Sequence, residues 1–509
     1  MRSFHRGLRD RPPMSDAEGI KRQILRSTSI IGGATIAGLL IGLLKMKAIA
    51  LLLGTTGVGL LGGLGSLLTM GASIAGMGID SSAVRQIAAA RDDPVRAAIV
   101  RRAVWSCAWA LALAGAFLFW LFRDKLAQLG LGSSAYSTQV GLLAPGIAAS
   151  ILAAAKVAQV QAYRRMGDLA RLRIGSALIA AIAGVGLVYE LGMGGVVAAV
   201  LAMPLATCLS ALLMTRAPGL PKVSPSIPEL AAEWRTLVGV GVAVTLTTIV
   251  GSATQAAVRG ILASDLGLDS AGLFQASYSI SSLNLGLVLG AMVPEYYPRL
   301  SEASNSPGTV RELLDHQVHV AFLIAAPALL AISAAAPILL HILYSEDFAR
   351  AALLLRLQIV ADALRLPGWA LGFVLLARRR TTAYVLVEVT LAIVFVPLAW
   401  WAAPRWGVAS AGAAYLIAYA MSLAVAMLCA FRDGIRLGGG NGVLLICLAA
   451  ALMLIAILST FNETASLIAG MAAFVFACCY SIRELDKLGI NRAWAAARLA
   501  RRGRDAGGA

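Results

Sequence analysis

Blocks of about 20 apolar residues, separated by short polar stretches, recur along the chain and constrain its fold more than any other feature. A block of that length crosses about 30 Å of hydrocarbon as one α-helix. Hydrophobic residues make up 59% of the 509 residues and charged residues 14%, against about 45–50% and about 25% in ordinary globular domains. These proportions exclude a water-soluble enzyme, a nucleic-acid-binding domain and a disordered protein. The sequence predicts an all-α, polytopic membrane protein.

Fourteen apolar segments are candidate transmembrane helices. Very short turns join the pairs at 174–215 and 381–431, as in helical hairpins. A stretch spaced by prolines, from Pro218 to Pro228, separates the sixth segment from the seventh and is typical of a linker. The segments lie at 27–53, 60–84, 103–122, 137–160, 174–191, 194–215, 236–262, 271–294, 317–343, 350–377, 381–402, 407–431, 442–460 and 465–482.

This pattern divides the chain into two lobes of six helices with extra segments at the ends. The N-terminal segment lacks an apolar h-region and is therefore not a secretory signal. The predicted parts are a basic N-terminal segment (1–26), a first lobe (27–215), a linker (216–235), a second lobe (236–431), an extra transmembrane hairpin (432–482) and a basic tail (483–509).

The positions of the basic residues orient the chain in the membrane. The formal net charge is +17, with 43 lysines and arginines. Cytoplasmic loops of membrane proteins carry an excess of these residues. If the N-terminus is cytoplasmic, only four fall in outer loops, namely Arg123, Lys125, Arg350 and Arg405. We therefore expect both termini in the cytoplasm and a location in the bacterial inner membrane. The basic tail could also lie on anionic lipid as an amphipathic helix (491–504).

The sequence gives little support to catalysis. No loop is long enough to fold as a catalytic domain, and the chain lacks a P-loop and an HExxH motif. Its six cysteines lie in apolar segments without metal-ligand spacing. We expect no catalytic residue, no cofactor and no metal site, and thus a protein that is not an enzyme.

The two halves contain similar segments. The stretch KAIALLLGTTGVGL (47–60) resembles RGILASDLGLDSAGL (259–273): each begins with a cation and carries glycines at similar spacing. Further on, MGID (77–80) matches MVPE (292–295). Two similar six-helix halves are typical of transporters, which hold the substrate between the halves. Chance similarity between apolar sequences is the alternative.

Two cations at matching positions are the candidates for substrate binding. Burying a charge in a span costs at least about 2.5–3.5 kcal/mol on insertion scales. Lys47 and Arg259, one in each half, predict two cations that face a shared cavity and receive an anion. Lys45 is a further candidate, although a spacing of two places it on another helix face from Lys47. The alternative for Lys47 is that its ammonium snorkels to the membrane surface.

Four charged residues near the inner boundary are expected to be structural, whereas three charges deeper in spans are candidates for ion coupling. Asp80 and Glu295 are each followed by an arginine, which predicts ion pairs of Asp80 with Arg85 and of Glu295 with Arg299. The coupling candidates are the following: Asp362, Glu388 and Arg365. A carboxyl in the middle of a membrane is a standard place for ion coupling.

Each coupling candidate has a structural alternative. Arg365 follows Asp362 at i+3, so the two could form an intrahelical ion pair. Glu388 has no charged neighbour on its own helix, and it could be a protonated carboxyl bound to another helix.

Several segments resemble the O-antigen and common-antigen repeat-unit flippases. These form the polysaccharide-transporter branch of the multidrug/oligosaccharidyl-lipid/polysaccharide exporter superfamily. The resemblance covers about residues 20–435 and depends on the order and spacing of motifs. They are Lys47 with GTTGVGL (54–60), AGMGI (75–79), YRRMGD (163–168), AGLFQASYSIS (271–281), PEYYPRLSE (294–302), LQIVADALR (357–365) and AYVLVEVT (383–390).

The resemblance implies a fold and an activity. The fold is two pseudo-symmetric six-helix lobes around a central cavity lined with cations. The activity is the alternating-access transfer of an undecaprenyl-diphosphate-linked oligosaccharide from the cytoplasmic to the periplasmic leaflet, for O-antigen or exopolysaccharide assembly. We expect a monomer whose partners are this substrate and membrane lipid, with a polysaccharide polymerase as a further candidate.

Other functions stay open at this point. Fourteen spans are more usual in the related flippases of peptidoglycan lipid precursors, and the same superfamily includes drug/cation antiporters. An antiporter predicts acidic residues rather than Lys47 in the first lobe. A glycan polymerase or ligase needs a large outer loop, which the sequence lacks. A scaffold without transport activity would not need buried charges at matching positions.

Reporter fusions test the predicted topology. Fusions after residues 130, 225, 265 and 485 should report outside, inside, outside and inside, because the positive charge lies on the cytoplasmic side. The measurement is the activity of a paired periplasmic and cytoplasmic reporter at each site. An outside signal at 225 or 485 would contradict the topology.

Overall fold

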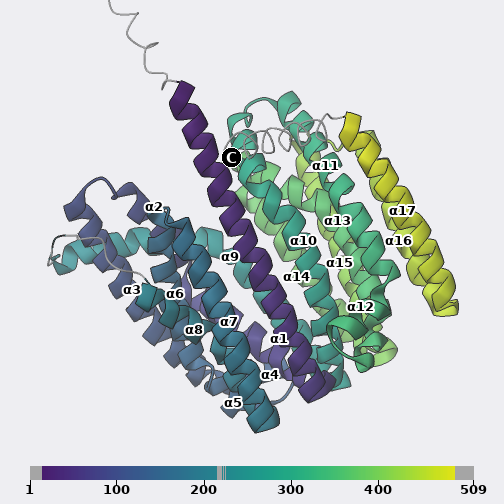
Figure 1. Ribbon diagram of the computed structural model, residues 1–509, viewed down its shortest axis with the longest axis horizontal. Helices are drawn as coiled ribbons and strands as arrows, with labels where there is room; N and C mark the ends of the chain where they lie inside the picture. Colours follow the sequence, from purple (N-terminus) through teal and green to yellow (C-terminus); the bar gives the residue numbers. More distant parts are fainter. Residues whose placement is uncertain (1–13, 215–220, 222, 224, 488–509) are drawn as a thin grey trace, which may run out of the picture. The chain divides into compact units, whose positions relative to one another are not determined.

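The computed structural model describes residues 14–214, 221, 223 and 225–487, and every regular element in them is a helix (Figure 1). The all-α prediction is confirmed. The elements are α1 (Met14–Gly76), α2 (Ile79–Ala89), α3 (Pro94–Leu121), α4 (Arg123–Leu131), η1 (Ser134–Tyr136), α5 (Ser137–Gly141), α6 (Ala144–Ala162), α7 (Met166–Leu191), η2 (Gly192–Gly195), α8 (Val196–Met214), α9 (Ile227–Leu266), α10 (Leu268–Glu302), α11 (Pro307–Ala334), α12 (Ala336–Leu343), η3 (Glu346–Ala351), α13 (Ala352–Ala377), α14 (Thr381–Trp406), α15 (Ala409–Arg432), α16 (Gly439–Phe461) and α17 (Glu463–Lys487).

Each apolar segment predicted from the sequence coincides with helix. Within the described residues, nine helical stretches are long and apolar enough to cross a membrane, or up to eleven if each of two bent pairs is one span. Two of these stretches, Gly32–Gly76 and Met166–Met214, have 45 and 49 residues. Each consists of two helices joined at a break, at Gly54 in the first and at η2 in the second, where α7 and α8 pack against each other. A stretch of this length is long enough for two spans of about 20 residues. The count of fourteen spans stays a prediction, and the basic tail at 491–504 lies outside the described residues.

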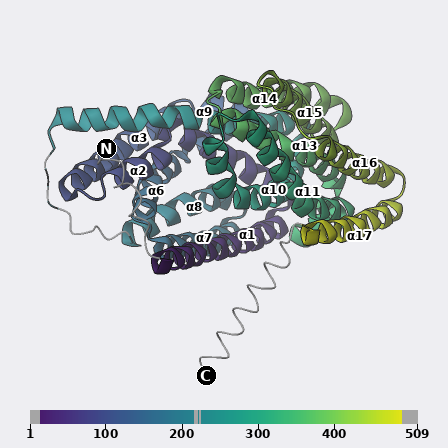
Figure 2. The same ribbon diagram turned by 90° about the horizontal axis from the view of Figure 1, so that it is seen from above.

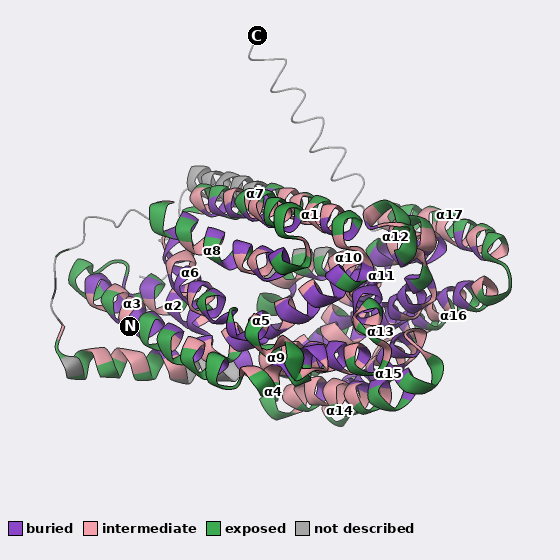
Figure 3. Cartoon of the chain, turned by 90° about the horizontal axis from the view of Figure 1, so that it is seen from below, coloured by how far each residue is buried: buried purple, intermediate pink, exposed green. Residues whose placement is uncertain are grey.

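Large apolar side chains are exposed along many helices, as expected for contact with lipid. On α14, Ile393 is 67% exposed and Trp400 is 64% exposed, and on α7 Ile182 is 66% exposed. Figure 3 shows exposed residues along these helices beside buried ones that face the rest of the chain. A soluble protein would bury such residues, because exposing them to water is unfavourable. The surface therefore agrees with a membrane protein.

The chain separates into two compact units. The first contains residues up to Ala48, Leu68–Arg123 and Ser137–Thr245. The second contains Ile49–Leu67, Asp124–Tyr136 and the chain from Leu246 onward. Two segments that the sequence analysis assigned to the first lobe, 49–67 and 124–136, thus pack with the second unit. The proposed lobe boundaries stay a prediction.

Small residues allow close helix packing in the first unit, where α6 packs against α2, α3 and α8. A Cβ added to Gly71 would lie 2.7 Å from Ile147 and 2.8 Å from Phe119. At the start of α3, the side chain of Asp93 accepts hydrogen bonds from the N–H groups of Val95 and Arg96. Since Pro94 lacks an N–H group, these contacts satisfy donors that the first helical turn otherwise leaves free.

In the second unit, α13 packs against α10, α11 and α15, and the hairpin α16–α17 packs on α11 and α13. Figure 2 shows α16 and α17 together at one edge of this unit. The guanidinium of Arg356 on α13, which is 1% exposed, binds the carboxylate of Glu463 at the start of α17. At the other end of the hairpin, the amide of Asn441 donates to the carbonyl of Asp315, 2.8 Å away. The hairpin is thus attached to the second unit at both ends.

The sequence repeat has a structural counterpart within the second unit. Gly54 interrupts α1 with φ 64° and ψ −160°, and Gly267 separates α9 from α10 with φ 87° and ψ 165°. Only glycine adopts this conformation readily. The two glycines occupy matching positions in the repeat, so both copies break the helix at the same place.

The repeated helices also cross at matching glycines. A Cβ on Gly59 would lie 2.0 Å from the carbonyl oxygen of Leu268, and a Cβ on Gly272 would lie 2.0 Å from that of Thr55. Leu268 and Thr55 each follow the helix-breaking glycine of their copy. The contact is therefore reciprocal, as expected for two copies related by a pseudo-two-fold axis. The hydroxyls of Thr55 and Thr56 donate to the carboxylate of Asp269 beside this crossing.

Replacing Gly272 with alanine should destabilise the protein. The added methyl group meets backbone that cannot move aside, and overpacking of this kind costs about 1–3 kcal/mol. Gly286 on the same helix is the matched control, because a Cβ there meets nothing within 4 Å. Thermal unfolding in detergent should show a lower Tm for Gly272→Ala and an unchanged or higher Tm for Gly286→Ala. Equal Tm values for the two variants would contradict the close crossing.

Candidate functional site

The two lysine candidates lie on α1 in the first unit. The ammonium of Lys45 donates to the carbonyl oxygen of Ala199 on α8, 3.1 Å away, and its side chain lies beside Gly184 of α7. Lys47 is half-buried two residues further along the helix. The hydrogen bond of Lys45 helps to attach α1 to α8, whereas the proposed role of Lys47 in binding an anion stays a prediction.

Arg259, the candidate cation of the second unit, is buried on α9 and is 4% exposed. Its Nε donates to the side-chain carbonyl of Gln275, 2.9 Å away, and its Nη1 donates to the backbone carbonyl of Gln255, 3.0 Å away. The guanidinium lies 5.3 Å from the ring centre of Tyr278. No ion pair within 4.0 Å joins it to a carboxylate of the described residues. A buried guanidinium held only by neutral groups is a strong candidate to receive an anion.

Asp362 is fully buried on α13, and its partner is on another helix. The hydroxyl of Ser281 on α10 donates to Oδ2 of Asp362, 2.6 Å away. The other carboxyl oxygen has no hydrogen-bond partner in the described part of the chain. The intrahelical ion pair with Arg365, which the i+3 spacing allowed, is not formed within 4.0 Å. Asp362 is thus held by a neutral group, with hydrogen-bonding capacity left over.

The three coupling candidates nevertheless lie in one region. The guanidinium of Arg365 lies 5.3 Å from the ring centre of Tyr419 on α15. Arg365 also interacts electrostatically with Asp362 on its own helix and with Glu388 on α14. The structure therefore places one arginine within electrostatic reach of both carboxyls. Their role in coupling transport to an ion stays a prediction.

Of the two expected structural ion pairs, one is present. Glu295 and Arg299 bind each other on α10. Asp80 and Arg85 are both exposed, and no ion pair joins them within 4.0 Å in the structure. Residues five apart lie on different sides of a helix, whereas residues four apart are neighbours. The different spacings of the two pairs in the sequence therefore account for the different outcomes.

A group of tyrosines near the arginines was not predicted from the sequence. Tyr278 on α10 packs edge-to-face on Tyr415 of α15 at 6.4 Å, and Tyr415 packs on Tyr419 at 4.7 Å. Tyr415 and Tyr419 are one helical turn apart, a spacing that could have identified them as one face of a span. No sequence pattern could have placed Tyr278 beside them, because it comes from another helix.

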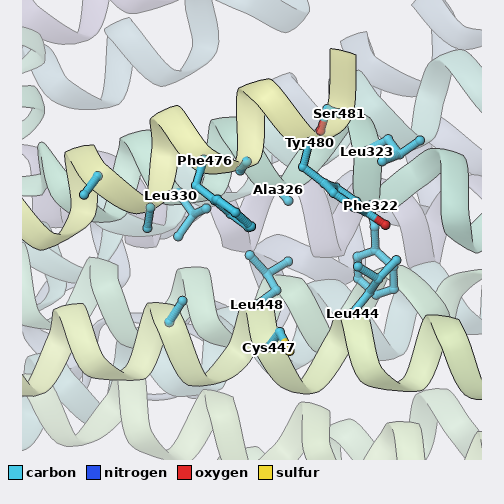
Figure 4. Close-up of a pocket in the computed structure, with 14 residues that line it drawn as sticks. Phe322, Leu323, Ala326, Leu330, Leu444, Cys447, Leu448, Phe476, Tyr480 and Ser481 are labelled. Carbon is cyan, nitrogen blue, oxygen red and sulfur yellow. The ribbon is translucent and has the colours of Figure 1, made fainter. Parts of the chain in front are cut away.

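The structure also contains an apolar cleft between α11 and the hairpin α16–α17, with a volume of about 400 Å³. Figure 4 shows Phe322, Leu330, Leu448 and Phe476 around it. Its lining is almost entirely hydrocarbon and lacks the candidate cations, so the cleft offers a place for apolar chains but not for charged groups. Among the described residues, no group of three or more His, Cys, Asp or Glu side chains could hold a metal ion.

Comparison with known proteins identifies relatives. The family model described as "Polysaccharide biosynthesis protein" matches residues 24–304. The lipid III flippase of Escherichia coli (strain K12) is 26% identical over 399 residues, covering 75% of this chain and 91% of that protein. The lipid III flippase of Shigella flexneri matches equally well.

Solved structures show the same fold at low sequence identity. The lipid II flippase MurJ, in an inward closed conformation, superposes with a TM-score of 0.67 at 13% identity, covering 89% of this chain and 99% of that one. An inward-facing multidrug resistance transporter of the MATE family and MOP superfamily gives a TM-score of 0.67 at 16% identity, covering 80% of this chain and 95% of that one. Together with the match of the family model over more than half of the sequence, these findings show that the chain belongs to the polysaccharide biosynthesis protein family.

Proposed function

We propose that this protein is a flippase for an undecaprenyl-diphosphate-linked oligosaccharide, which it moves from the cytoplasmic to the periplasmic leaflet of the bacterial inner membrane. The observation that carries the proposal is Arg259, a buried guanidinium without a carboxylate partner at a position that repeats in the two halves. The similarity to relatives named lipid III flippase supports a lipid-linked substrate. The product serves the assembly of a surface polysaccharide such as O-antigen or exopolysaccharide.

The diphosphate is the part of the substrate that is hardest to move through hydrocarbon. Lys47 in the first repeat and Arg259 in the second supply positive charge to it, and guanidinium groups bind phosphate oxygens in a bidentate manner. Transfer then proceeds by alternating access, with the repeated halves as the moving parts. The glycines at the helix breaks, Gly54 and Gly267, allow the helix ends to change direction.

A flippase for a peptidoglycan lipid precursor is the second candidate. The fold superposes on that of the lipid II flippase MurJ over 89% of this chain, and the hairpin α16–α17 adds two helices to the twelve-segment pattern. The diphosphate chemistry is the same in both proposals, so the two differ in the group that the diphosphate carries. A drug/cation antiporter is less well supported, because Arg259 repels a cationic substrate.

Removing the charge of Lys47 or Arg259 should impair flipping. With Lys47→Ala or Arg259→Gln, the diphosphate loses a charged partner in a region of low dielectric, where such contacts are strong. Lys47→Glu and Arg259→Glu should be worse, because they repel the diphosphate. Flipping is measured with lipid-linked oligosaccharide in proteoliposomes, and Arg432→Gln, at the exposed end of α15, is the control. Full activity of the Lys47→Glu, Arg259→Glu double variant would rule out an anion-binding role.

We further propose that the carboxyls of Asp362 and Glu388 couple transport to an ion. Moving one charge across 100 mV is worth about 2.3 kcal/mol, so a negative interior assists the outward movement of the diphosphate. The return of the empty carrier is then the step that needs an ion. Asp362, with one oxygen free of partners, is the first candidate to carry a proton, and Glu388 is the second. Arg365 is placed to compete for either carboxylate.

Asp362→Asn should slow turnover and flatten its dependence on pH, because an amide cannot release a proton. Glu388→Gln is tested beside it, and Glu302→Gln, at the exposed end of α10, is the control. The measurement is transport in vesicles with an imposed pH gradient. If the gradient acts equally on the wild type and on both variants, these carboxyls are structural.

A further inference from the structure

We propose that Tyr278, Tyr415 and Tyr419, with Arg259 and Arg365 at the two ends of their row, form a carbohydrate-binding platform in the second unit. The platform receives the sugar next to the diphosphate. This inference rests on the proposed function, because it assigns the sugar of the same substrate to residues beside Arg259. The five residues come from four helices, α9, α10, α13 and α15 (Figure 1), and all of them belong to the second unit.

The contacts form a continuous row. The guanidinium of Arg259 lies 5.3 Å from the ring centre of Tyr278, which lies 6.4 Å from that of Tyr415. The Tyr415 ring centre lies 4.7 Å from that of Tyr419, and the guanidinium of Arg365 lies 5.3 Å from the Tyr419 ring centre. Each step is within the range of an aromatic pair or of a cation–π contact. Side chains far apart in the sequence thus make one surface.

Part of this surface is accessible. Tyr278, Tyr419 and Arg365 are half-buried, whereas Tyr415 between them is 1% exposed. The accessible parts of Tyr278 and Tyr419 remain for a ligand, while Tyr415 packs edge-to-face against both rings. A sugar ring has an apolar face of C–H groups that packs well on the electron-rich face of an aromatic ring.

A polar group near the rings has capacity left for a hydroxyl. Oδ1 of Asp362 is buried without a hydrogen-bond partner among the described residues. Buried polar groups are nearly always paired in native structures. Such a group near half-buried rings marks a place where a ligand rich in hydroxyls completes the hydrogen bonds.

The charge of the row selects against other ligands. Two guanidinium groups repel a cationic drug, although the aromatic rings alone would attract one. An anion without a sugar would use the arginines but not the rings. The combination fits a sugar attached to a diphosphate, in which the charge lies at Arg259 and the ring lies along the tyrosines.

Binding to two lipids tests the inference. The probes are undecaprenyl diphosphate without sugar and undecaprenyl diphosphate carrying one N-acetylglucosamine, and the full-length protein is in nanodiscs. Tyr278→Leu and Tyr419→Leu keep apolar bulk but remove the ring. They should weaken binding of the glycosylated lipid roughly tenfold and leave the affinity for the sugar-free lipid unchanged. Arg259→Gln should weaken both.

Two further variants separate binding from folding. Tyr419→Phe keeps the ring and should bind the glycosylated lipid far better than Tyr419→Leu. Tyr344→Leu is the control, because Tyr344 is as buried as Tyr415 but packs against Phe348 outside the row. If the ring-removing variants bind both lipids like the control, or lose both equally, the platform is refuted while the flippase proposal stands. If the wild type binds neither lipid, both proposals fail.

Discussion

A guanidinium group inside a membrane protein needs hydrogen-bond acceptors and aromatic rings around it. In the second unit, residues of α9 and α10 provide these contacts for Arg259. An unpaired charge in hydrocarbon is costly. Arg259 therefore donates hydrogen bonds to the side chain of Gln275 and to the backbone carbonyl of Gln255, and its guanidinium lies over the ring of Tyr278. Because these partners are neutral, they solvate the charge without cancelling it. The site therefore keeps its attraction for an anion.

Glycine residues allow the helices of the two repeats to pack closely. At Gly59 and Gly272 the helices approach so closely that a single methyl group would overlap a carbonyl oxygen of the other copy. Helices in lipid gain little from the hydrophobic effect on association, so close backbone contact is a main source of their attraction. The same repeat that places a cation in each half thus also provides the surface on which the two copies cross.

The sequence predicted the helices and the repeat well, because apolar length and glycine spacing are local properties. It could not predict the choice of partners across helices. Asp362 binds Ser281, 81 residues away, rather than Arg365 one turn along the same helix. The tyrosine row was missed for the same reason. Asp80 and Arg85 are different, since their five-residue spacing alone argued against an ion pair.

The attachment of α16–α17 at both ends has a mechanical consequence. Arg356 binds Glu463 where α17 begins, and Asn441 near the start of α16 binds Asp315 on α11. A hairpin held at two points cannot pivot on either, so it follows the motion of α11 and α13. A fluorophore or spin label on the exposed face of α17, at Ile468 for example, would therefore report the displacement of the whole second unit rather than a local fluctuation.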